Sequence, residues 1–96
     1  MTPNTIIKPG SGFSGATLAS TPFGTTVNLL RFDGGVFDAN GTVQYAFWAH
    51  HATLCTWGRA PTFRNATTTD FKLGDPADSG HSYGCKLIEP QFYRTT

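Results

Sequence analysis

The chain is short of glutamate and of charge in general. Glu89 is its only glutamate, and 14% of its 96 residues are charged, against about a quarter in an average globular protein. Glutamate is a common surface residue of helices, so its scarcity argues against a helical fold. A surface this poor in charge consists of threonine, serine, asparagine and glycine, or is covered by partners.

Other features that the sequence lacks exclude some classes of partner. The basic residues are scattered and the formal net charge is +1, so we expect no nucleic-acid partner. No apolar run approaches the roughly 18 residues that a membrane helix needs, so we expect no membrane partner. The opening MTPNTIIKPG lacks the apolar centre of a signal peptide. We therefore expect synthesis in a host cytoplasm, with an extracellular location as the alternative.

Threonine, glycine, phenylalanine and proline dominate instead, with 15, 11, 8 and 6 copies. Threonine and aromatic residues suit strands, and glycine and proline supply turns. This composition predicts an all-β fold, which we expect to be a small antiparallel β-sandwich or flattened barrel. Residues 16–96 would form one β domain. Residues 1–15 are so rich in proline and glycine that we expect an extended N-terminal arm.

The longest stretch without glycine or proline is 42–57. Val43, Phe47 and the residues between them alternate as on a strand, although a helix would also place some of them on one face. Aromatic and β-branched residues dominate, so we predict two strands. Aromatic side chains are expected to form the core. Trp48 falls on the opposite, polar side of its strand and is the best candidate for a partner contact. Asn40 and its following glycine predict a hairpin turn.

Two cysteines, Cys55 and Cys85, lie in apolar segments. A disulfide between them would stabilise the fold by about 3–4 kcal/mol in an oxidising compartment, whereas in a cytoplasm they would be buried thiols. Each follows a histidine by four residues, so His51, Cys55, His81 and Cys85 form a possible zinc set. Positions four apart on a strand are separated by about 13 Å, too far for one metal. We therefore expect no metal and no cofactor.

No catalytic motif is present in full. Asp78-Ser79-Gly80 resembles, in three residues, the nucleophile loop of chymotrypsin-like proteases. Ala77 and His81 stand where that family has glycines, and the chain is too short for the two barrels that hold its triad. Asp-Ser-Gly is also an ordinary turn composition. We therefore expect that the protein is not an enzyme.

The abundance of threonine and glycine, the low charge and the arm with Ile6 and Ile7 resemble the small β-rich decoration, or cement, proteins of bacteriophage capsids. The resemblance is one of composition. It implies a non-enzymatic structural accessory protein of a virus particle, located in the virion and bound to a capsid protein. It also implies a homo-oligomer, which in that family is commonly a trimer. Thr5, Ile6, Ile7 and Trp48 would make the contacts.

A different class of function fits the same composition. The chain could be a secreted β-sandwich binding module for carbohydrate or for a host protein. This alternative predicts a monomer with a disulfide between Cys55 and Cys85. The native mass and the state of the two thiols therefore distinguish the two hypotheses.

Overall fold

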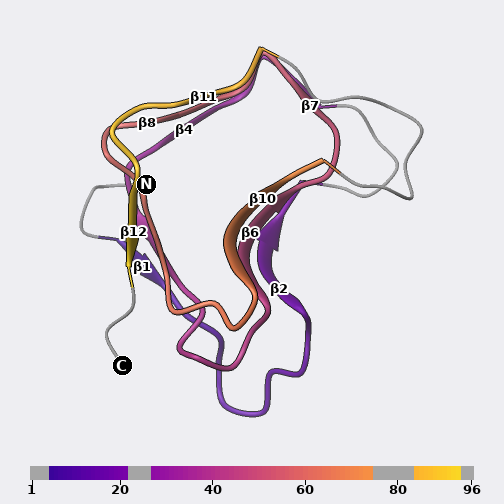
Figure 1. Ribbon diagram of the computed structural model, residues 1–96, viewed down its shortest axis with the longest axis vertical. Helices are drawn as coiled ribbons and strands as arrows, with labels where there is room; N and C mark the ends of the chain where they lie inside the picture. The colour runs from indigo at the N-terminus through magenta and orange to yellow at the C-terminus, as the bar shows by residue number, and fades with distance from the viewer. Residues whose placement is uncertain (1–4, 22–26, 75–83, 94–96) are drawn as a thin grey trace.

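Strands are the only regular elements in the part of the chain that the computed structural model describes, residues 5–21, 27–74 and 84–93. The all-β prediction is therefore confirmed for these residues. The antiparallel arrangement is wrong, because every pair of strands is parallel. The chain winds in successive turns as a parallel β-solenoid (Figure 1). No described helix is long and apolar enough to cross a membrane.

The strands are short, from two to five residues each. They are β1 (Ile6–Ile7), β2 (Thr17–Ser20), β3 (Val27–Asn28), β4 (Arg31–Asp33), β5 (Val36–Asp38), β6 (Tyr45–Ala49), β7 (Ala52–Thr53), β8 (Thr56–Gly58), β9 (Thr62–Arg64), β10 (Thr69–Leu73), β11 (Lys86–Leu87) and β12 (Gln91–Tyr93).

These strands stack into four sheets that form the sides of the solenoid. The orders are β1-β5-β9-β12, β2-β6-β10, β3-β7 and β4-β8-β11. Paired residues come from successive turns: β1 to β4 belong to turn 1, β5 to β8 (residues 36–58) to turn 2 and β9 to β11 to turn 3, and β12 opens a further turn. Figure 1 shows the strands of one sheet lying over one another, as expected for a view along the solenoid axis.

Residues with positive φ occupy the corners. Asn40 and Gly41 have φ of 59° and 73°, as a hairpin turn requires, but they lead from β5 to β6, which belong to different sheets. At the corner between the third and fourth sides, Leu29, Leu54 and Gly84 recur in successive turns with φ of 59°, 56° and 68°. A left-handed residue at the same place in each turn bends the chain the same way, so that the turns stack.

The core is a set of aromatic columns along the solenoid axis. In-register parallel strands place equivalent side chains one above the other, so their rings stack. The stacked ring pairs have centroid distances of 5.3 to 5.7 Å and are Phe37–Phe63, Phe63–Phe92, Phe47–Phe71 and Phe32–Trp57. Neighbouring columns meet edge to face, as Phe37 and Phe47 do at 90°. The predicted aromatic core is thus confirmed at these positions apart from Phe92, which is 49% exposed.

Two further predictions concern the path of the chain. Residues 45–49 and 52–58 contain three strands and no helix, so the strand interpretation of 42–57 is confirmed where strands occur. Ile6 and Ile7, which the sequence places in the extended arm, form β1 and pair with Val36 and Phe37. Ile7 packs against the core and Ile6 is exposed.

Candidate functional site

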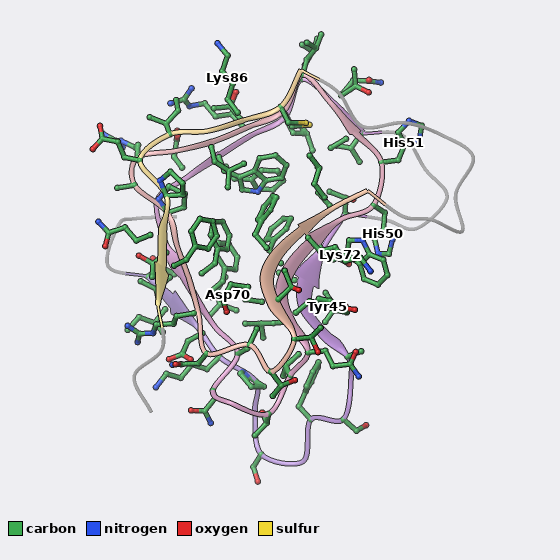
Figure 2. All side chains as sticks on the ribbon, in the orientation of Figure 1. Tyr45, His50, His51, Asp70, Lys72 and Lys86 are labelled. Atoms are coloured by element: carbon green, nitrogen blue, oxygen red, sulfur yellow. The ribbon has the colours of Figure 1, made fainter. Side chains whose placement is uncertain are left out.

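The outer side of the β2-β6-β10 sheet carries a cluster of aromatic and cationic side chains. Alternation along β6 is not strict: Ala46 and Phe47 are both buried in the core, whereas Trp48 is half-buried on the outer side. Tyr45, His50 and Lys72 lie on that outer side, away from the ring-filled interior (Figure 2). The sheet therefore presents aromatic surface to solvent as well as to the core.

Trp48 is held in one orientation. Its indole Nε1 donates a hydrogen bond to the carbonyl oxygen of Gly74 at 2.7 Å. Its ring stacks on His50, with a centroid distance of 4.0 Å and an interplanar angle of 22°. The ring of Tyr45 lies 5.1 Å away and is tilted by 51°. Because three contacts fix the indole on a sheet, it is preorganised for a ligand.

Lys72 supplies the charge of the site. It pairs with Trp48 in the adjacent turn, and its Nζ lies 4.1 Å from the Trp48 ring centroid and 4.9 Å from that of Tyr45. These distances are typical of cation–π contacts. The ion pairs found among the described residues, Arg31 with Asp33 and Arg64 with Asp38, do not involve Lys72.

Hydroxyl groups flank the rings. Thr17 and Thr69 stand on either side of Tyr45 in the register of the sheet, and Ser20 and Lys72 stand on either side of Trp48. In-register residues of a parallel sheet point to the same side. We call the outer surface formed by Thr17, Ser20, Tyr45, Trp48, His50, Thr69 and Lys72 the Trp48 face. It offers ring surface, hydroxyls and one ammonium group.

The other residues predicted to contact partners lie elsewhere. Thr5 and β1 belong to a different sheet, in which the carbonyl oxygen of Thr5 accepts a hydrogen bond from Val36 N at 2.8 Å. The structure therefore does not bring Thr5, Ile6 and Ile7 into one site with Trp48.

The two cysteines occupy equivalent positions in adjacent turns, because Thr56 pairs with Lys86. Neither forms a disulfide in this structure; Cys55 is buried and Cys85 is half-buried. The Sγ of Cys55 donates to the carbonyl oxygen of Val27 at 3.5 Å. The Sγ of Cys85 donates in the same way to Ala52, one turn further on, at 3.4 Å. In this structure the cysteines therefore act as small packed residues with weak backbone hydrogen bonds.

The possible zinc set is not assembled in the described part of the chain. Residues 5–21, 27–74 and 84–93 contain no group of three or more side chains that could hold a metal ion. His51 lies on the outer side of the solenoid (Figure 2), whereas Cys55 is buried. His81, like Asp78-Ser79-Gly80, lies outside the described residues.

A second polar cluster surrounds Asp38, and the sequence analysis missed it. The Asp38 carboxylate is 3% exposed and accepts hydrogen bonds from Asn40 N at 2.8 Å, Asn65 Nδ2 at 3.0 Å and Arg64 Nε at 3.0 Å. Burial raises the pKa of Asp38, but the hydrogen bonds from Asn65, Asn40 and Arg64 outweigh it, so the pKa lies below 3.8. A carboxylate so fully bonded holds two turns together and is unsuited to act as a general base.

Of the Trp48 face, sequence reasoning found Trp48 alone. Strict alternation along the strand would place Tyr45 on the same side as Phe47. Lys72 lies 24 residues after Trp48 in the sequence, and the two residues are seen to be neighbours only when the register between the turns is known. His50 was not connected with Trp48 either. No protein-family model, curated protein sequence or solved structure significantly matches this chain, so its function rests on the residues themselves.

Proposed function

We propose that this protein is a non-enzymatic binding module that holds carbohydrate against the Trp48 face. The observation that carries the proposal is the fixed indole of Trp48, which lies on the outer side of a rigid sheet beside Tyr45. Tryptophan on a surface exposes apolar area to water at a free-energy cost. The ring is already covered in part by His50 and by the Lys72 head group, so a ligand recovers the free energy of the area that is uncovered when Lys72 moves aside.

Sugars suit such a surface because a pyranose ring has one side made of C–H bonds, which packs on the electron-rich side of an aromatic ring. Its hydroxyl groups need hydrogen-bonding partners around that contact. Ser20 and Thr69, both exposed, offer hydroxyls in the strands on either side of β6. Rings at the centre and hydroxyls at the edge therefore match a polyhydroxylated ligand with an apolar side.

Binding to a panel of immobilised polysaccharides tests the proposal. Trp48→Ala should reduce binding by at least about fivefold, since the stacking of a planar nucleic-acid base on one aromatic ring contributes about 1–3 kcal/mol. Phe13→Ala is the matched control, because Phe13 is an exposed aromatic residue outside the β2-β6-β10 sheet. Equal binding by both variants, with circular dichroism unchanged, would contradict the assignment of the Trp48 face.

A structural role in a virus particle is the second candidate function, and the exposed leucines at one corner favour it. Leu29, Leu30 and Leu54 are all exposed there, Leu29 by 73%. Leu29 and Leu54 also adopt positive φ, although glycine occupies the equivalent place in turn 3. Exposed apolar side chains in a strained backbone fit a contact with another subunit. The candidate is an accessory protein, as in phage capsid decoration, that forms homo-oligomers and binds a capsid protein.

The oligomeric state tests this second candidate. Light scattering of the wild type should give the mass of a symmetric oligomer, and Leu29→Asn with Leu54→Asn should give a monomer. Asparagine tolerates positive φ, so the double variant should still fold. A wild-type protein that is monomeric across the micromolar range and does not bind capsid protein would exclude this role.

A further inference from the structure

We propose that the carbohydrate bound at the Trp48 face is acidic, a polymer of uronic acid units, and that Lys72 selects it by pairing with the ligand carboxylate. This inference rests on the proposed function. It adds the chemical class of the ligand and assigns the specificity to one residue.

The position of the Lys72 ammonium group is the first argument. It lies over the two aromatic rings on which the sugar is proposed to pack, 4.1 Å from the centroid of Trp48 and 4.9 Å from that of Tyr45. A carboxylate hydrogen-bonded to Nζ at about 2.8 Å is therefore within reach of a sugar ring that covers Trp48 or Tyr45. The side chain is long and unbranched, so its head group moves aside while keeping its charge next to the rings.

The second argument is that no carboxylate of the described residues forms an ion pair with Lys72. Asp70, two residues earlier on β10, lies on the other side of the strand (Figure 2), and its Oδ1 accepts the backbone N–H of Ala66 at 2.9 Å. Asp33 and Asp38 are engaged by arginines elsewhere. Among the described residues, the charge beside the rings is thus positive and not neutralised by an acidic side chain, which favours an anionic ligand.

The surroundings of the charge distinguish a sugar acid from other anions. In the described strands, the other basic residues lie in different sheets from Lys72, namely Arg31, Arg64 and Lys86, and the net charge of the chain is only +1. The described strands therefore form no basic stripe beside Trp48 that could follow a polyanion. One ammonium group among hydroxyls and rings matches a ligand with one carboxylate per sugar unit. Binding to a nucleic-acid strand would instead require several basic side chains in contact with its phosphates.

Polygalacturonate and its fully methyl-esterified form make a matched pair of probes, since esterification removes the charge and keeps the sugar. Titration calorimetry on the full chain should show that the free acid binds about two- to fivefold more tightly, the range of an exposed ion pair. Lys72→Met removes the ammonium group, keeps most of the unbranched apolar stem, and should abolish that preference. Lys86→Met removes the same charge from another sheet and should retain it.

Each outcome has a distinct meaning. Equal affinity of the wild type for the acid and the ester, with binding still dependent on Trp48, would overturn the acidic ligand and leave the carbohydrate function standing. Loss of the preference in Lys86→Met as well as in Lys72→Met would overturn the role of Lys72. Tighter binding of single-stranded oligothymidylate would overturn the sugar assignment. No binding to any polysaccharide would reject the proposed function itself.

Discussion

Phe47 and Trp48 are neighbours on β6 and have opposite surroundings. Phe47 is 3% exposed and packs against five aromatic side chains, Phe32, Phe37, Trp57, Phe63 and Phe71. Trp48 contacts an imidazole, a phenol, an ammonium group and a carbonyl oxygen. The same class of side chain thus stabilises the fold on one side of the strand and forms a polar-edged surface on the other. In a solenoid, a displacement of one residue along the chain decides between the two roles.

The largest expected effect is on stability and separates these two residues. Phe47→Ala should lower the free energy of unfolding by about 4 kcal/mol, because it removes a ring and leaves a cavity among rings that cannot collapse. Trp48→Ala should cost about 1 kcal/mol, since its ring is half-buried. Urea denaturation followed by circular dichroism measures both. Comparable losses of stability in the two variants would show that Trp48 belongs to the core, and would contradict the contrast between Phe47 and Trp48.

Substitution of Asp38 should give the next largest loss of stability. Its side chain is polar, as those of the Trp48 face are, but it is buried, as that of Phe47 is. Its folded-state pKa lies below the ordinary 3.8, so its stabilising contribution is present above about pH 3.8 and is lost as the pH falls through the lowered value. Asp38→Ala should cost about 3 kcal/mol at neutral pH, because it removes the buried carboxylate that accepts hydrogen bonds from Asn40, Asn65 and Arg64. It should also flatten the acid limb of a stability–pH curve. An unchanged acid limb would show that other carboxyl groups cause the acid sensitivity.

The corner residues give the smallest effects, of opposite sign. Gly84→Ala should destabilise the fold by about 1 kcal/mol, because φ is +68° and the new Cβ would meet Leu54 Cδ2. Leu29→Gly should stabilise it or leave it unchanged, since glycine adopts a φ of 59° without strain and the leucine side chain is exposed. Thermal denaturation measures both. A marked loss in Leu29→Gly would show that the exposed leucine makes a stabilising contact.

The sequence predicted the strands because composition and alternation are local properties. It did not predict the parallel winding, because successive turns repeat a backbone conformation and the directions of their side chains, and do not repeat residue types. Leu29, Leu54 and Gly84 share a left-handed conformation but not a residue type. The asparagine–glycine pair at 40–41 has the positive φ values of a hairpin turn and still connects different sheets. Positive φ fixes a local bend; the pairing partner of the next strand is decided by packing.

The same limit applies to the candidate site. Trp48 could be found, because alternation along one strand places it opposite Phe47. Lys72 could not, because its place beside Trp48 depends on the number of residues in the corner between the two turns. Asp38 stands next to the hairpin turn predicted at Asn40, but its partners Arg64 and Asn65 come from the following turn of the solenoid and are not predicted by any local pattern. Contacts between turns can be predicted only when the register between the turns is known, and no local sequence pattern specifies that register.

The stacking of turns also determines which part of the molecule exchanges its amide hydrogens most slowly. In a linear array each unit is stabilised by its direct neighbours, so fraying starts at the ends. Among the described turns, residues 36–58 alone have a complete sheet neighbour on both sides at β5, β6 and β8. Amides of β6 should therefore remain protected after those of β1 and β12 have exchanged. A ligand bound over Trp48 would be held by the part of the solenoid that opens last.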